Sequence, residues 1–148
     1  MLSYETLDTI ADAYIPILLI VIALSLTTNF KHPHILLTLV CRLILLMLLP
    51  YGLMFADQAL NIWGKYHSDY STHTAVAATC CWYLFWLRKK SKLTVSIFYS
   101  HFIYWLWPLS LTAYLALMNY QNYHSWMDML TTLVVLGPFL VMHRVAIR

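Results

Sequence analysis

Two short polar turns of the sequence each carry a histidine directly before an apolar segment. The first, residues 69–75, reads Asp-Tyr-Ser-Thr-His-Thr-Ala and contains His73, whereas the second, residues 119–128, contains His124 and Asp128. A carboxylate beside one imidazole nitrogen fixes the tautomer and makes the other nitrogen a better base or nucleophile. A helix that begins near His124 would place His124 and Asp128 on one face, because they are four residues apart. The pattern predicts catalysis by this pair, with His73 as the proton donor.

The same two turns offer groups that could bind an anion. The start of each following helix has backbone N–H groups without partners and the positive end of the helix dipole, which favour a phosphate. The candidate substrate-binding side chains are Ser71, Thr72, Thr74, Lys65, His67 and Asn122, and Asn119 and Gln121 are further polar groups nearby. The alternative interpretation is that these are polar residues that cap helices at a membrane interface, where such residues are ordinary.

Hydrophobic residues make up 61% of the 148-residue chain and charged residues only 10%. This composition excludes an ordinary soluble domain and indicates one integral membrane domain. We expect an all-α, polytopic membrane helix bundle with five transmembrane helices, over about residues 13–29, 35–56, 73–87, 93–118 and 129–142. Residues 1–12 are too polar to cross a membrane and predict a short helix lying at the interface, with a frayed terminus as the alternative.

Five spans would divide the charged residues between two sides of the membrane. Nearly all basic residues then fall on one side, and all six acids fall on the other, where Lys65 is the only basic residue. The basic side holds Lys31, Arg88, Lys89, Lys90, Lys92, Arg144 and Arg148; the acidic side holds Glu5, Asp8, Asp12, Asp57, Asp69 and Asp128. The positive-inside rule therefore predicts that the N-terminus and both histidine turns lie outside the cytoplasm and that the C-terminus lies in it. We expect the membrane to be the plasma (inner) membrane.

These residues resemble a known family. Residues 70–75, Tyr-Ser-Thr-His-Thr-Ala, are similar to the Ser-Gly-His-Thr motif of the type 2 phosphatidic acid phosphatase superfamily, and residues 124–128 are similar to its His-x-x-x-Asp motif. One helix pair separates the motifs, as in that superfamily, and the resemblance covers residues 35 to 142. It implies that His124 attacks phosphorus to form a phosphohistidine, that Asp128 orients it, and that His73 protonates the leaving oxygen.

The chain departs from that superfamily at three places. The first motif, a lysine followed by Arg-Pro, is missing, and only Lys65 and His67 are available in the corresponding loop. Met118 stands near the position of an expected arginine, and Thr72 replaces the glycine of Ser-Gly-His. Sphingomyelin synthase-like members of the wider clan also keep the His, His, Asp set without the full first motif.

The sequence thus predicts a lipid phosphatase or phosphotransferase that acts on a lipid (pyro)phosphate, such as phosphatidate or a polyprenyl pyrophosphate. We expect no cofactor, no metal and no nucleic acid partner, and the sequence leaves open whether the chain forms a homo- or hetero-oligomer in the membrane. One rival is a non-catalytic membrane subunit or lipid-binding partner with the same fold. Another is a small transporter or proton relay that uses Arg42 and His101, both of which lie inside apolar segments.

Overall fold

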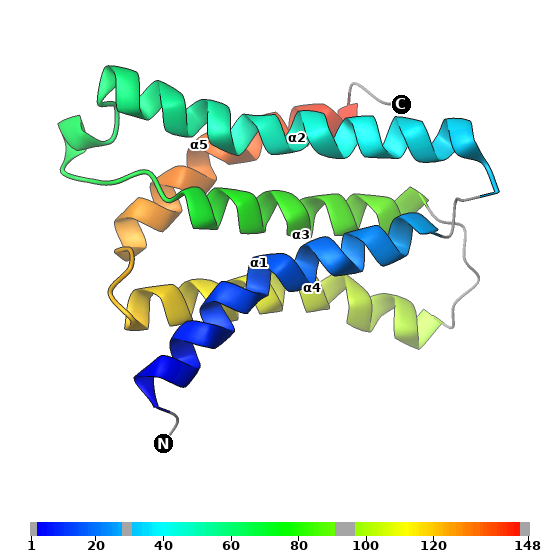
Figure 1. The fold of residues 1–148 in the computed structure, drawn as a ribbon, viewed down its shortest axis with the longest axis horizontal. Helices are drawn as coiled ribbons and strands as arrows, with labels where there is room; N and C mark the ends of the chain where they lie inside the picture. The colour runs from blue at the N-terminus through cyan, green and yellow to red at the C-terminus, as the bar shows by residue number, and fades with distance from the viewer. Residues whose placement is uncertain (1–2, 28–30, 91–96, 146–148) are drawn as a thin grey trace.

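The fold is a bundle of five helices, seen in a computed structural model (Figure 1). The structure describes residues 3–27, 31–90 and 97–145, and the side chains of these residues except for 88–90, 97–104 and 144–145. The helices are α1 (Tyr4–Thr27), α2 (Pro33–Leu60), α3 (Thr72–Lys90), α4 (Ile97–Tyr120) and α5 (Trp126–Val145), with a short 3-10 helix, η1 (Gly64–Tyr66), before α3. Successive helices run in opposite directions, so the turn before α3 and the turn before α5 lie at the same end (Figure 1).

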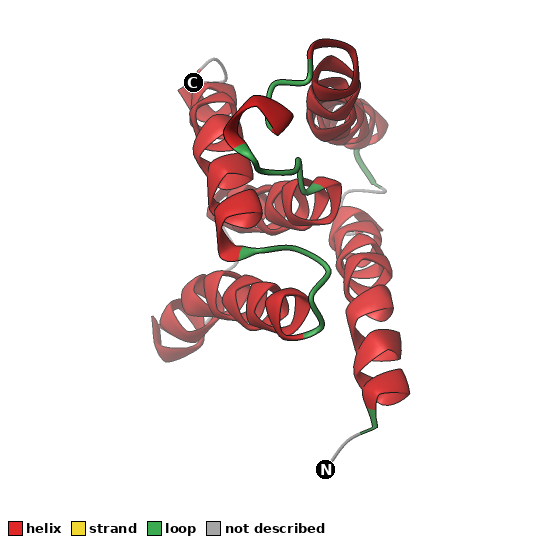
Figure 2. Ribbon diagram, turned by 90° about the vertical axis from the view of Figure 1, so that its left-hand side faces the viewer, coloured by secondary structure: helices red, strands yellow, loops and turns green. Residues whose placement is uncertain are grey.

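Helix α3 is the centre of the bundle. It packs against each of the other four helices, and an end-on view shows one helix surrounded by the others (Figure 2). Its first half is built of small residues, and Ala75, Ala77 and Ala78 are all buried. Small side chains let neighbouring backbones approach closely. The alanine-rich segment therefore forms a helix that can be enclosed on every side.

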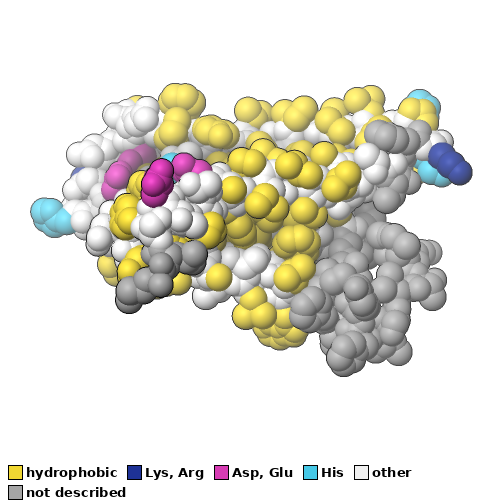
Figure 3. Space-filling view, turned by 60° about the horizontal axis from the view of Figure 1, so that its bottom comes forward, with side chains coloured by type: hydrophobic (Ala, Val, Ile, Leu, Met, Phe, Trp, Pro, Cys, Tyr) yellow, Lys and Arg dark blue, Asp and Glu magenta, His cyan; other side chains and the backbone are white. Residues whose placement is uncertain are grey.

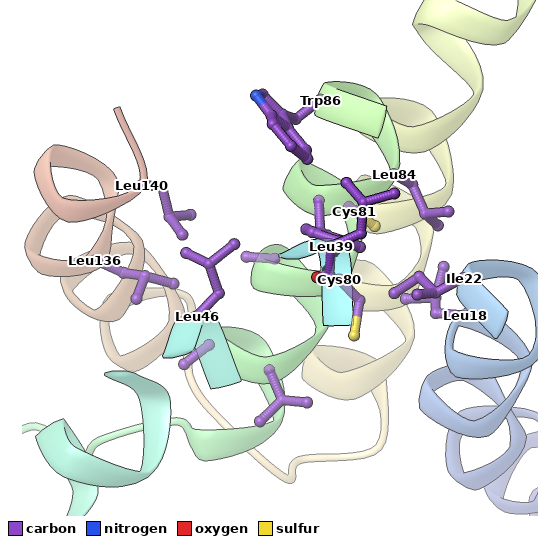
Figure 4. Packing of buried hydrophobic residues seen from close by; sticks show 14 of the residues in the cluster. Leu18, Ile22, Leu39, Leu46, Cys80, Cys81, Leu84, Trp86, Leu136 and Leu140 are labelled. Atoms are coloured by element: carbon purple, nitrogen blue, oxygen red, sulfur yellow. Dashed lines mark hydrogen bonds between the residues drawn. The ribbon is translucent and has the colours of Figure 1, made fainter. Parts of the chain in front are cut away.

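The apolar core lies on either side of α3. Leu18 and Ile22 of α1 and Leu39 and Leu46 of α2 meet a row of α3 side chains that includes Cys80 (Figure 4). Leu136 and Leu140 of α5 complete this cluster from another side (Figure 4). A second cluster joins α3 to α1, α4 and α5; it comprises Ala11, Ala77, Tyr114, Leu115, Met118 and Met129.

The outer surface of the bundle is apolar over its middle. Within the described residues, three helices are long and apolar enough to cross a membrane, namely α1, α2 and Trp126–His143 of α5. Many of their large apolar side chains point outward, which a bilayer would cover. Figure 3 shows this apolar band between acidic side chains at one end and a basic group at the other. The chain is thus an all-helical protein with helices suited to a membrane.

The first helix differs from the one predicted. We expected a short interfacial helix over residues 1–12 and a separate span that begins at residue 13, but α1 is continuous from Tyr4 to Thr27. No residue near the expected boundary ends a helix, because Asp12 and Ala13 both tolerate helical backbone. Pro16 lies inside α1 and removes only one backbone hydrogen bond. The polar stretch is therefore the first part of a long helix.

Candidate functional site

The start of α3 is capped by the Ser-Thr-His-Thr string itself. Ser71 precedes the helix, and its hydroxyl donates to Thr74 Oγ1 at 2.8 Å and accepts from the Thr74 N–H at 3.3 Å. The Ser71 N–H donates to the hydroxyl of Thr132 in α5 at 3.1 Å. Ser71 and Thr74 are completely buried. The two hydroxyls therefore hold the helix start in place, as N-cap residues do, and the Ser71 N–H ties it to α5.

The start of α5 is capped in a second way. Ser125 precedes the helix, and Asp128 Oδ2 accepts hydrogen bonds from its N–H at 2.9 Å and from its hydroxyl at 2.7 Å. The Asp128 N–H donates back to Ser125 Oγ at 3.2 Å, which completes a reciprocal capping box. The other oxygen, Asp128 Oδ1, accepts from the Asp69 N–H at 2.8 Å. Asp128 thus joins the two histidine turns to each other.

This arrangement corrects the expected geometry of Asp128. Helix α5 begins at Trp126 rather than near His124, so the spacing of four residues does not place His124 and Asp128 on one helical face. In the described structure, the Asp128 carboxylate accepts hydrogen bonds from Ser125 and Asp69, and no hydrogen bond joins it to His124. Asp128 acts on His124 through its charge. Its role in orienting a nucleophile stays a prediction.

The two histidines of the turns lie side by side. The ring centroids of His73 and His124 are 6.5 Å apart, and the ring planes are tilted by 48°. His73 is exposed and His124 is half-buried, and neither imidazole makes a hydrogen bond to the described part of the chain. The His124 carbonyl accepts from the side-chain amide of Asn119 at 3.2 Å, which holds the turn. Both rings can therefore engage a ligand between them.

The environment of His124 determines its protonation. Burial lowers the pKa of His124 below its ordinary value of 6.5, and the neighbouring His73 acts in the same direction. The carboxylates of Asp69 and Asp128 oppose this effect by raising the pKa. The net direction is downward, so the neutral imidazole dominates at pH 7. A neutral imidazole has the lone pair that a nucleophile or base requires.

The loop before α3 is fastened to two helices. The Trp63 indole N–H donates to the Thr131 hydroxyl at 3.0 Å, and the Tyr70 hydroxyl donates to the Pro50 carbonyl at 2.9 Å. The Trp63 and Tyr70 rings also meet edge to face. These contacts place the remaining loop side chains at the surface.

The other predicted substrate-binding residues differ in exposure. Lys65 in η1 and His67 at its end are exposed, and so is Asn122 in the turn after α4. Thr72, the first residue of α3, is partly exposed. His67 and Asn122 both have positive φ, 54° and 59°, so each occupies a sharp bend. These side chains border the end of the bundle that holds the histidine pair.

Asp69 was not among the predicted site residues, and Gln121 was named only as a further polar group near them. Asp69 acts on His124 through its carboxylate and holds Asp128 through its N–H. Gln121 is 4% exposed, and neither the nitrogen nor the oxygen of its side-chain amide has a hydrogen-bond partner in the described structure. The sequence contained a signal for the engagement of Asp128, because Ser125-x-x-Asp128 before an apolar run indicates a capping box.

The other residues considered for chemistry lie elsewhere. Arg42 is in the half of α2 farthest from the histidine pair, and the His101 side chain is outside the described residues. Among the side chains that the structure describes, no three His, Cys, Asp or Glu residues are grouped as a metal site would require. Comparisons with family models, with curated proteins and with solved structures give no match.

Proposed function

We propose that the chain is a membrane lipid phosphatase or phosphotransferase that acts on a lipid (pyro)phosphate at the extracytoplasmic face. The observation that carries this proposal is the 6.5 Å separation of the His73 and His124 rings, each without a hydrogen bond to the described chain. A nucleophile attacks from about 3–3.5 Å, and a proton passes over about 2.6–3.2 Å. One phosphoryl group between the two rings could therefore contact both.

The proposed reaction divides two roles between the histidines. A neutral nitrogen of His124 attacks phosphorus; a nitrogen–phosphorus bond forms and the bond from phosphorus to the lipid oxygen breaks. His73, as the imidazolium, gives its proton to that leaving oxygen. A water molecule, or the hydroxyl of an acceptor, then attacks the phosphohistidine and returns a proton to His73. Phosphate or the phosphorylated acceptor leaves, and His124 is neutral again.

The surroundings support binding of the phosphate in part. The backbone N–H groups at the starts of α3 and α5 are directed toward this end of the bundle, and helix N-termini favour anions. Lys65 is exposed here and is the one basic residue among the acids of this end. We propose that Lys65, together with His67 and Asn122, replaces the missing first motif, the lysine followed by Arg-Pro. Five transmembrane spans and an N-terminus outside the cytoplasm belong to the same proposal.

The test is phosphate release by the purified chain from phosphatidate in mixed micelles. We expect His124→Ala to abolish release and His73→Ala to lower kcat by about 10²–10⁴-fold, the usual contribution of a general acid. His32→Ala is the matched control, because His32 is exposed at the opposite end of the bundle and should leave the rate unchanged. Equal rates for wild type and His124→Ala would end the proposal.

A second candidate function is a non-catalytic membrane subunit or lipid-binding partner. It is favoured by one specific observation: Ser71, Thr74, Ser125 and Asp128 all serve as helix caps in the described structure. A scaffold of this kind would show no turnover and would form no acid-labile phosphohistidine with labelled substrate. Trapping of a phosphoryl group on wild type but not on His124→Ala separates the two functions.

A further inference from the structure

A second cluster of polar side chains lies at the end of the bundle away from the histidine pair. Arg42 of α2, Trp86 of α3 and His143 of α5 meet there. The Arg42 guanidinium carbon is 5.3 Å from the centre of the Trp86 ring, and the His143 ring meets the same indole edge to face at 5.9 Å. Trp86 projects from α3 toward the side of the apolar core that Leu140 of α5 occupies (Figure 4).

The cluster has hydrogen-bonding groups that the protein does not satisfy. Arg42 Nη1 is buried without a partner among the described residues, and so are both ring nitrogens of His143. The Trp86 face attracts the cation but cannot accept the in-plane N–H groups of a guanidinium. The Tyr83 hydroxyl donates its proton to the Leu39 carbonyl at 2.8 Å, so that proton is not available to a ring nitrogen of His143. Buried polar groups are nearly always paired, which points to a missing acceptor.

None of the six acidic side chains lies where it could supply that acceptor. All six acidic residues lie in the N-terminal half of α1, at the end of α2, or in the turns and helix start that surround the histidine pair. They are Glu5, Asp8, Asp12, Asp57, Asp69 and Asp128. The sequence instead places further basic residues beside the cluster, with Arg88–Lys90 after Trp86 and Arg144 after His143. Within the part of the chain that the structure describes, no carboxylate reaches the cluster, so a bound anion is an acceptor that fits it.

We propose that Arg42 and His143 bind a phosphate-class oxyanion beside Trp86, at a site separate from the histidine pair. The planar guanidinium fork suits phosphate oxygens, and an imidazole N–H adds a donor from a different helix. Arg42 lies nine residues after Pro33, about 14 Å along α2, which is within reach of the membrane interface. The oxyanion could belong to the headgroup of an anionic lipid or to free phosphate, and the experiment separates these sources.

The test uses the full-length chain in phosphatidylcholine nanodiscs. Thermal unfolding is followed while phosphatidylglycerol is added to the bilayer, and separately while inorganic phosphate is added to the buffer. A Tm that rises with phosphatidylglycerol alone identifies a lipid headgroup, whereas a rise with inorganic phosphate identifies a soluble anion. Arg42→Gln should lower the affinity for whichever ligand raises the Tm by about tenfold or more. A wild-type Tm that responds to neither ligand overturns the proposal.

Two further variants make the result specific. Lys31→Gln removes one exposed charge at the same end of the bundle and should retain the wild-type response. His143→Phe keeps an aromatic ring against Trp86 but removes both nitrogens, so it should weaken binding without loss of the ring contact. This variant decides the question if Arg42→Gln does not fold. Wild-type binding by His143→Phe, or by Arg42→Gln, would show that the cluster is a packing contact and not a ligand site.

Discussion

His124 is the residue whose surroundings are best suited to chemistry at neutral pH. It is half-buried, and burial lowers its pKa, while the Asp69 and Asp128 carboxylates act in the opposite direction. His73, in contact with solvent, lies 6.5 Å away. One ring is thus kept neutral by desolvation, and the other can exchange protons with solvent directly.

The lowered pKa of His124 predicts the acidic limb of the pH–rate profile. Protonation of His124 removes the nucleophilic lone pair, so the rate falls as pH drops through the pKa of this group. Because that pKa is below the ordinary value of 6.5, we expect activity to persist below pH 6.5. Measurement of kcat/KM against pH for phosphate release tests this. A limb centred above pH 6.5 would contradict the assignment of His124 as nucleophile.

Asp69 offers a second test, which concerns the effect of its carboxylate on the pKa of His124. Its carboxylate raises the pKa of His124, so Asp69→Asn removes that effect and should move the acidic limb to still lower pH. The asparagine in this variant keeps the backbone N–H of residue 69 that donates to Asp128. NMR titration of the His124 imidazole gives the pKa directly, and Glu5→Gln on α1 serves as the control for the loss of one acidic charge. An unchanged or raised pKa in Asp69→Asn would count against this arrangement.

The choice of His73 and His124 could be made from sequence, because their positions at the starts of two helices follow from hydropathy. The contacts of Asp128 could not be predicted in the same way. They depend on where α5 begins, and a shift of two residues turns a helical neighbour of His124 into a capping residue. The grouping of Arg42 with Trp86 and His143 could not be predicted either, because these residues come from helices that are distant in the sequence.

At the scale of helices, the two histidine turns behave as one unit. The Asp128 carboxylate caps α5 and also holds the Asp69 N–H, while the Thr132 hydroxyl of α5 accepts from the Ser71 N–H. The spacing of His73 and His124 is therefore set by bonds between the helix starts. Tyr123 adds a link to α1, because its hydroxyl donates to Asp8, and this bond raises the pKa of Tyr123 to about 12.

The caps predict a measurable loss of stability. Ser125→Ala removes the hydroxyl that donates to Asp128 and accepts its N–H, and loss of such an N-cap costs about 0.5–2 kcal/mol. We expect a corresponding decrease in the free energy of unfolding in detergent. Ser68→Ala is the control, because the structure gives the Ser68 hydroxyl no partner among the described residues. Equal stability of the two variants would show that the cap contributes nothing.

The helices themselves were largely predictable, and their ends were not. The apolar runs locate five helices because long apolar segments need helical backbone in a membrane. The continuous α1 was missed because polarity was used as the boundary, although a helix can continue past the point at which its side chains become polar. The 3-10 turn over Gly64–Tyr66 has no strong sequence signal and depends on the tertiary contacts of Trp63.

At the scale of the molecule, charge and hydropathy together predict an orientation in the membrane. The acids gather at the end that holds the histidine turns, and an apolar surface separates them from the opposite end (Figure 3). Three helices of the described chain have the length and hydropathy of a membrane span. Five spans with an external N-terminus are our prediction from the distribution of Lys and Arg.

Cysteine labelling in intact cells tests this orientation. In a Cys41→Ala background, which removes the exposed native thiol, we expect Tyr66→Cys to react with a membrane-impermeant maleimide. Tyr66 is 78% exposed in the loop before α3. Lys31→Cys, exposed in the turn between α1 and α2, should react only after the cells are opened. Labelling of both positions in intact cells, or of neither, would contradict the predicted topology.

The enclosure of α3 has a consequence for how the chain is made. A translocon admits a segment to the bilayer largely by that segment's own hydrophobicity. Helix α3 is not among the helices with the hydropathy of a span, yet each of the other four packs against it. Helices α1 and α2 are made before it, and α4 and α5 after it. With five spans, as we predict, α3 would enter the membrane stably only after α4 and α5 emerge, so we expect its integration to be a cooperative step late in translation.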